Sequence, residues 1–280
     1  MQNNNKISFA LKNTNWCNLR CAHCCECSGP NVAPNIMPLT TVEKYIDEFN
    51  TLPMDKWQHM VFTGGEAMAP YFYKQMDYIP QCLTMAAEHK MIPFIKTNGI
   101  WGADTEMRNR ILRDVAAAAY KNNMLMSLDL SIDEFHDNDV AVYNILNDVV
   151  RSNYLAPAVR ISLCSLNTPA SHAKFARLIQ QLQNGNLNIQ VNNYGEFSVD
   201  VPMMHKVAIY YDLLTNVSAT GRAKVNNIGH YMPSGLPDPD TGHCLQIDNS
   251  DVATLNYKYR TPVNGRAMVD VVSELIAKVR

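Results

Sequence analysis

Short apolar runs alternate with amphipathic, helix-like segments along most of the chain, and no other feature of the sequence constrains the fold as strongly. A strand, a helix and a second strand in succession form a βα unit, and repeated βα units build a mostly parallel sheet. We therefore expect an α/β fold. The expected strands are residues 7–14, 59–62, 92–96, 125–130, 159–163 and 207–214.

Helices are expected between these strands. The first opens at residues 38–43, where Thr40 and Glu43 match the pattern of a capping box. The others are expected at about 71–89, 105–120, a segment that ends near 151, and 171–183.

The alternation loosens after the last of these helices. Residues 188–201 suit a hairpin or an irregular insertion, and 243–257 suit a second small hairpin. Residues 226–239 are rich in Gly, Pro and Asn, which indicates a linker or a long loop. Apolar residues on one face of the last segment predict an amphipathic helix: Met268, Val271, Val272, Leu275, Ile276 and Val279. We divide the chain into a polar tail (1–6), a main domain (7–225) and a small C-terminal extension (226–280).

Polar and cysteine-containing motifs follow the expected strands. They are a cysteine-rich loop after residue 14, Gly64-Gly65-Glu66, Thr97-Asn98-Gly99, Ser131-Ile132-Asp133 and Gly221-Arg222-Ala223. Ligands bind at the carboxyl ends of the strands in barrels and open α/β sheets. We therefore expect these motifs to contribute to one active site.

The cysteines of the first motif are the strongest chemical signal. Five of the eight cysteines fall between Cys17 and Cys27, which is typical of metal binding rather than of a disulfide framework. Iron–sulfur clusters usually have four thiolate ligands, so Cys17, Cys21 and Cys24 alone would leave one iron open. Three alternatives stand beside this: Cys27 completes a closed cluster, the loop binds zinc, or the loop binds no metal.

Cys17-x3-Cys21-x2-Cys24 after the first strand, with Gly64-Gly65-Glu66 after the second, resembles the radical S-adenosylmethionine (radical SAM) enzymes. The resemblance covers about residues 7–223. The later motifs resemble the branch of that family that contains peptide maturases and their SPASM relatives. Those relatives carry further cluster cysteines after the barrel, whereas only Cys244 lies there in this chain. The extension therefore resembles a degenerate SPASM domain.

The resemblance implies a partial (β/α)6 barrel that binds a [4Fe–4S] cluster through Cys17, Cys21 and Cys24. S-adenosylmethionine (AdoMet) would bind the open iron and, after one-electron reduction, yield a 5′-deoxyadenosyl radical that abstracts a hydrogen atom from the substrate. A flavodoxin- or ferredoxin-type protein would supply the electron. The resemblance also implies cofactor contacts for eight residues: His23, Gly64, Gly65, Glu66, Thr97, Asn98, Ser131 and Asp133.

Each of these motifs also has a purely structural interpretation. Gly64-Gly65-Glu66 suits the approach of a ligand and its ammonium group, but also a turn with a helix-capping Glu. Ser131 and Asp133 suit a ribose diol or a carboxylate, but also a helix cap. Thr97-Asn98-Gly99 is also a common turn sequence. Glu134 and His136 are close enough in sequence to face a substrate, and the alternative for His136 is a structural hydrogen bond.

Two further thiols are candidates for donating a hydrogen atom to a substrate radical. Cys25 follows the cluster ligand Cys24 directly, and its alternative role is that of a small buried residue. Cys164 comes at the end of an expected strand. Either thiol would suit an epimerase or a reductase.

Composition limits the remaining function classes. The net charge is −2 and no run of Lys or Arg occurs, which argues against a nucleic-acid or membrane-binding surface. No apolar run approaches the roughly 18 residues of a spanning helix, and the polar N-terminus is not a signal peptide. We expect a cytoplasmic enzyme that modifies a ribosomally made peptide, by crosslinking or epimerisation. The alternatives are radical chemistry on a small metabolite and a non-enzymatic iron–sulfur electron carrier.

Overall fold

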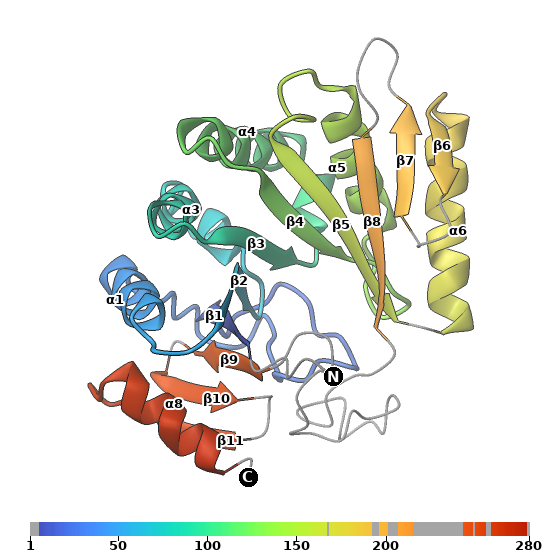
Figure 1. The fold of residues 1–280 in the computed structure, drawn as a ribbon. Coiled ribbons are helices and arrows are strands. Elements are labelled where there is room, and N and C mark those ends of the chain that lie inside the picture. Colours follow the sequence, from blue (N-terminus) through green and yellow to red (C-terminus); the bar gives the residue numbers. More distant parts are fainter. Residues whose placement is uncertain are drawn as a thin grey trace, which may run out of the picture. The chain divides into compact units, whose positions relative to one another are not determined.

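The computed structural model describes residues 6–166, 168–191, 196–200, 207–214, 243–248, 250–255 and 259–278. Strands and helices alternate from β1 (Ile7–Thr14) to β8 (Val207–Leu214), which confirms the α/β class (Figure 1). The chain divides into two compact units. The N-terminal unit comprises Met1–Phe94 and Val217–Arg280, and the central unit comprises Ile95–Asn216. The division falls within β3 (Ile92–Thr97).

In the N-terminal unit, β1 lies between two parallel neighbours. It pairs with β2 (Lys56–Gly64) on one side and with β9 (His243–Ile247) on the other. β10 (Val252–Leu255) pairs antiparallel with β9 and with β11 (Tyr259–Pro262). The hairpin expected at 243–257 is confirmed, and the parallel pairing of β9 with β1 joins residues 243–247 to the first strand. The domain boundary expected at residue 225 lies outside the described residues.

The helices of this unit are α1 (Leu39–Asn50), α2 (Ala69–Phe72), α3 (Tyr78–Glu88) and α8 (Met268–Ala277). α1 packs against β1, α3 and α8, and the rings of Phe9 and Phe49 stack 4.4 Å apart between β1 and α1. The amphipathic helix expected at the C-terminus is confirmed, because α8 buries Met268, Val271, Val272 and Leu275.

Two expectations for these helices were wrong. No side chain caps the start of α1, where Pro38 is the N-cap residue, so Thr40 and Glu43 do not form a capping box. The helix expected at 71–89 is interrupted between α2 and α3, where Lys74 adopts a left-handed φ of 60°. The apolar pattern continues across this interruption, which explains why the sequence suggested one helix.

In the central unit, the strand order is β4-β5-β8-β7-β6. β4 (Met126–Ser131), β5 (Val159–Leu166) and β8 are parallel. β7 (Glu196–Asp200) pairs antiparallel with β8 and with β6 (Asn188–Val191), so the expected hairpin is confirmed. The helical elements are η1 (Ile100–Ala103), α4 (Thr105–Lys121), α5 (Asp139–Arg151) and α6 (Pro169–Asn184).

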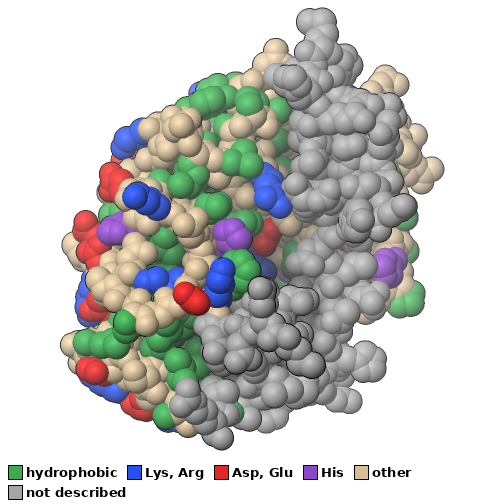
Figure 2. Space-filling model, in the orientation of Figure 1, with side chains coloured by type: hydrophobic (Ala, Val, Ile, Leu, Met, Phe, Trp, Pro, Cys, Tyr) green, Lys and Arg blue, Asp and Glu red, His purple; other side chains and the backbone are tan. Residues whose placement is uncertain are grey.

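Figure 2 draws one face of the described residues. On the face drawn in Figure 2, acidic and basic side chains are scattered among hydrophobic and uncharged ones. Among the described helices, none combines the length and the apolar character that a membrane span requires.

Candidate functional site

The cysteine-rich loop leaves β1 and closes at its base. Trp16 forms a parallel β-bridge with Gly29, and the backbone N–H of Cys17 donates to the carbonyl of Gly29 at 3.4 Å. Within the loop, the N–H of Cys24 donates to the carbonyl of Cys21 at 3.2 Å, which forms a tight turn. The two ends of the loop therefore lie side by side at the Trp16–Gly29 bridge, and the turn brings the backbones of Cys21 and Cys24 close to each other.

The three expected ligands form an electrostatically coupled group with Glu66. Cys17 is 7% exposed, and the N–H of Leu19 donates to its Sγ at 3.4 Å. The pKa of the Cys17 thiol is raised to about 12, mainly by burial and to a smaller extent by the negative charges of Glu66, Cys21 and Cys24. Acidic groups gathered in this way favour a bound cation, because a metal centre offsets their mutual repulsion.

Cys25 and Cys27 have different surroundings in the same loop. The Sγ of Cys25 lies 3.9 Å from Oε1 of Glu26, which forms an ion pair with Lys12 at 2.5 Å. Burial raises the pKa of the Cys25 thiol to about 12, with smaller contributions from Glu26 and Cys24. Cys27 is exposed and has a left-handed φ of 56°.

Gly64 and Gly65 join the end of β2 to the start of the cysteine loop. The N–H of Gly65 donates to the carbonyl of Thr14, and the N–H of Glu66 donates to the carbonyl of Trp16, both at 2.8 Å. A Cβ on Gly65 would lie 2.1 Å from the carbonyl oxygen of Trp16, and one on Gly64 would lie 2.3 Å from that of Thr14. Gly64 also has a φ of 139°, which favours glycine. Both glycines are therefore required for the docking of the two loops.

Glu66 is almost completely buried, with 1% exposure. Its Oε1 accepts a hydrogen bond from the N–H of Met68 at 2.9 Å, just before α2. Glu66 therefore contacts the residue before α2 and not an N–H of the helix itself, so the helix-capping alternative is not confirmed. A buried carboxylate is also the kind of group that binds an ammonium ion, so the contact with Met68 orients Glu66 without excluding that role.

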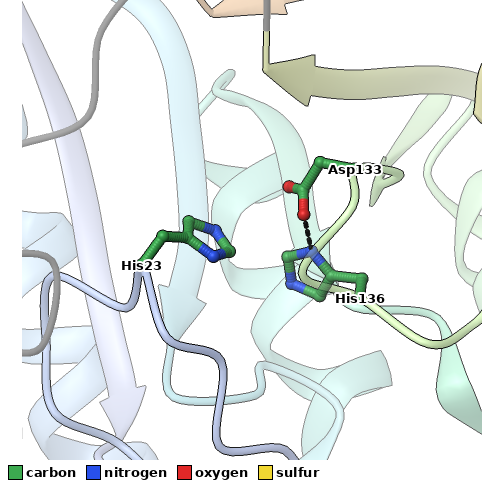
Figure 3. A group of neighbouring side chains, drawn as sticks. All are labelled: His23, Asp133 and His136. Carbon is green, nitrogen blue, oxygen red and sulfur yellow. Dashed lines mark hydrogen bonds and ion pairs between the residues drawn. The ribbon is translucent and has the colours of Figure 1, made fainter. Parts of the chain in front are cut away.

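In the central unit, Asp133 forms a buried pair with His136 just after β4 (Figure 3). Oδ1 of Asp133 accepts from Nδ1 of His136 and from the N–H of Phe135, both at 2.9 Å. Asp133 is not the cap of α5, because that helix begins only at Asp139. Ser131 is half-buried at the end of β4. His23, also drawn in Figure 3, is half-buried in the cysteine loop of the N-terminal unit.

Thr97 and Asn98 shape the turn between β3 and η1. Oγ1 of Thr97 accepts from the N–H of Gly99 at 3.1 Å and from Nε1 of Trp101 at 2.9 Å. Oδ1 of Asn98 accepts from the N–H of Ile100 at 3.0 Å. These contacts agree with the turn interpretation of the motif.

Cys164 lies next to Ser131 in the sheet. β5 extends to Leu166, beyond the expected end at 163, so Cys164 is inside the strand. It is in register with Ser131 across the parallel β4–β5 pair and is 9% exposed. Residues in register project to the same face, so the thiol and the Ser131 hydroxyl share one side of the sheet.

Two further sequence predictions concern Glu134 and the Gly221-Arg222-Ala223 motif. The Glu134 carboxylate accepts from the hydroxyls of Thr168 and Ser171 at the start of α6, so it contacts a helix end. Gly221-Arg222-Ala223 lies outside the described residues.

Asn138 and Lys174, which no motif indicated, contact the backbone of the loops after β3 and β4.

Solved structures share this fold at low sequence identity. SuiB from Streptococcus suis, bound to S-adenosylmethionine, has a TM-score of 0.54 and 11% identity, over 95% of this chain and 65% of SuiB. Native anSMEcpe with bound AdoMet has a TM-score of 0.51 and 13% identity, over 96% of this chain and 80% of that chain. The chain thus spans about two thirds of the length of SuiB. No family model and no curated protein matches the sequence.

Proposed function

We propose that the protein is a radical SAM enzyme in which Cys17, Cys21 and Cys24 bind a [4Fe–4S] cluster. The observation that carries the proposal is the loop that holds these three cysteines, which closes at the Trp16–Gly29 bridge and accepts a hydrogen bond from the N–H of the buried Glu66 at the carbonyl of Trp16. The fold supports it, because SuiB and anSMEcpe share that fold and their structures contain S-adenosylmethionine. We further propose that the strands form a partial (β/α)6 barrel.

The donor set fits such a cluster. Three thiols supply one ligand fewer than a closed cluster uses, which leaves an iron available to the amino and carboxylate groups of AdoMet. The chemistry that the cluster supplies when bound is one electron for the reductive cleavage of AdoMet, which allows hydrogen abstraction from a substrate.

The remaining roles belong to side chains of the protein. In the N-terminal unit, Glu66 would accept hydrogen bonds from the AdoMet ammonium group, while Gly64 and Gly65 hold its loop against the cysteine loop. His23 would pack near the adenine. In the central unit, Thr97, Asn98, Ser131 and Asp133 would contribute cofactor contacts, as the family resemblance implies.

The substrate we favour is a ribosomally made peptide, because the motifs resemble the branch that contains peptide maturases. The missing cluster cysteines of the extension favour the alternative, a small metabolite. A flavodoxin- or ferredoxin-type protein would donate the electron in either case. Cys164 and Cys25 would be hydrogen donors to the substrate radical, and the position of Cys164 beside Ser131 favours the former.

Anaerobic reconstitution with iron and sulfide tests this proposal. The reduced wild-type protein should convert AdoMet into 5′-deoxyadenosine, and its electron paramagnetic resonance spectrum should change when AdoMet is added. Cys17→Ala should abolish both signals, whereas Cys27→Ala, a change at an exposed cysteine of the same loop, should retain them. A wild-type protein that forms a cluster only with Cys27 and yields no 5′-deoxyadenosine would instead be an electron carrier.

A further inference from the structure

Asn138 connects the two loops that carry the expected cofactor residues of the central unit. It directly precedes α5 and is 3% exposed. Its Nδ2 donates to the carbonyl of Asn98 at 2.5 Å and to the carbonyl of Ser131 at 2.7 Å. One side-chain amide therefore joins the end of β3 to the end of β4.

This use of Asn138 differs from the ordinary role of an asparagine at the start of a helix. An N-cap Asn usually accepts a hydrogen bond from a backbone N–H in the first turn of its own helix. Asn138 occupies the N-cap position of α5, yet its side chain makes no capping hydrogen bond. Its amide group contacts the neighbouring loops instead.

Lys174 completes the arrangement from α6. It is 5% exposed. Its Nζ donates to Oδ1 of Asn138 at 3.1 Å, donates to the carbonyl of His136, and pairs with Asp139 at 2.7 Å. These three oxygen partners match the three donors of an ammonium group. The positive charge on the acceptor side of the Asn138 amide also polarises it, which strengthens the two hydrogen bonds that its Nδ2 donates.

The segment from Ser131 to His136 is thus held at both ends. Asn138 binds the carbonyl of Ser131, and Lys174 binds the carbonyl of His136. We propose that Asn138 and Lys174 form a carbonyl clamp, and that they are positioning residues that orient Ser131, Asp133 and Asn98 for AdoMet. This inference rests on the proposed function, since it assigns these two residues to the same cofactor site.

Asn138→Asp tests the clamp with almost no change in volume. The carboxylate still accepts from Lys174 but offers no donor to the carbonyls of Asn98 and Ser131. We expect faster amide hydrogen exchange in residues 97–103 and 131–137 of the variant without AdoMet. In the reconstituted enzyme, we expect the KM for AdoMet in 5′-deoxyadenosine formation to rise about tenfold or more, as the loss of such hydrogen bonds implies. The rate at saturating AdoMet should fall less than that.

Asn144→Asp is the matched control. Asn144 lies on α5, and its side-chain amide donates a long hydrogen bond of 3.3 Å to the carbonyl of Gly102. The KM of the Asn144→Asp variant for AdoMet should stay near that of the wild type. Lys174→Met is the second variant, because it removes the charged partner while leaving the Asn138 amide in place, and it should give a smaller rise in KM.

The outcomes separate the clamp from the proposed function. Wild-type protein that makes no 5′-deoxyadenosine overturns both the enzyme proposal and the AdoMet role of the clamp. An active wild type whose Asn138→Asp variant keeps its KM overturns the clamp alone, whatever the exchange data show. Unchanged exchange in both loops also overturns it. Faster local exchange with a raised KM supports it, and an unchanged exchange pattern elsewhere excludes general unfolding.

Discussion

Asp133 accepts a hydrogen bond from Nδ1 of His136 at 2.9 Å, and the two side chains are only 6% and 11% exposed. The same carboxylate oxygen accepts from the N–H of Phe135. A buried carboxylate with these two donors orders the loop after β4, whether or not it also contacts a ligand. The pair therefore has a consequence for stability that can be measured without a cofactor.

We expect Asp133→Asn to lower the free energy of unfolding by about 1–3 kcal/mol, because His136 loses its charged acceptor in a buried position. Urea denaturation of the metal-free protein measures this change. Asp137→Asn is the control, since Asp137 is an exposed residue of the same loop, and it should alter the free energy by less than about 0.5 kcal/mol. Equal effects of the two substitutions would mean that the Asp133–His136 pair contributes no stability of its own.

The docking of the Gly64-Gly65 turn on the cysteine loop gives a second prediction. Gly65→Ala would put a Cβ 2.1 Å from the backbone carbonyl oxygen of Trp16. Because this oxygen belongs to the backbone, only a shift of the loop would relieve the clash. We expect a loss of about 1–3 kcal/mol in unfolding free energy and a lower iron content per chain after reconstitution.

Gly29→Ala is the matched control for this change. Gly29 closes the same loop, but an added Cβ would meet its nearest neighbour, the carbonyl oxygen of Leu19, at an ordinary 3.8 Å. It should load iron as the wild type does. Normal loading by Gly65→Ala would show that the cysteine loop does not depend on its contact with the end of β2.

Much of the fold was predictable because it depends on local patterns. The apolar runs at 7–14 and 207–214 became β1 and β8 with the expected ends. β11 was missed, because Tyr259–Pro262 is short, polar and contains a proline, as edge strands often do. The pairing of β9 with β1 was also missed, since it joins residues more than two hundred positions apart and has no local signal.

The candidate site also has features that were predictable from the sequence and features that were not. The positions of Gly64 and Ser131 at strand ends followed from the alternation of strands and helices. The contacts of Asn138 with Asn98 and Lys174 did not, because they join residues 40 and 36 positions apart. In a sequence, a single Asn before a helix predicts an N-cap. The contacts of Asn138 with other loops depend on tertiary packing, which the sequence pattern does not indicate.

Stability at alkaline pH should depend on Cys82, which lies on α3. Burial raises the pKa of its thiol far above the ordinary value of 9.0, although a hydrogen bond with Tyr78 opposes the shift. Above about pH 9 the unfolded chain releases this proton while the folded protein retains it, so folding loses stability as the pH rises. The contribution of Cys82 is about 1.4 kcal/mol per pH unit in this range.

Urea denaturation at pH 8, 9 and 10 should therefore show a shallower decline of the unfolding free energy for Cys82→Ala than for the wild type. Tyr78→Phe is the control. Burial also raises the pKa of Tyr78, but from an ordinary value of 10.0, so its own contribution begins at higher pH. Identical slopes for the wild type and Cys82→Ala would show that the thiol ionises equally in both states.

A substitution of Glu134 distinguishes a structural role of this residue from a role at the substrate. Its carboxylate accepts from the hydroxyl of Thr168 at 2.9 Å and from that of Ser171, at the first turn of α6. An anion there interacts favourably with the helix N-terminus, so Glu134→Ala should lower the unfolding free energy by about 1 kcal/mol. The KM for AdoMet should stay unchanged. A double-mutant cycle with Thr168→Ala should show coupling between the two residues. Unaltered stability with a raised KM would instead place Glu134 at the cofactor or the substrate, as its position after Asp133 first suggested.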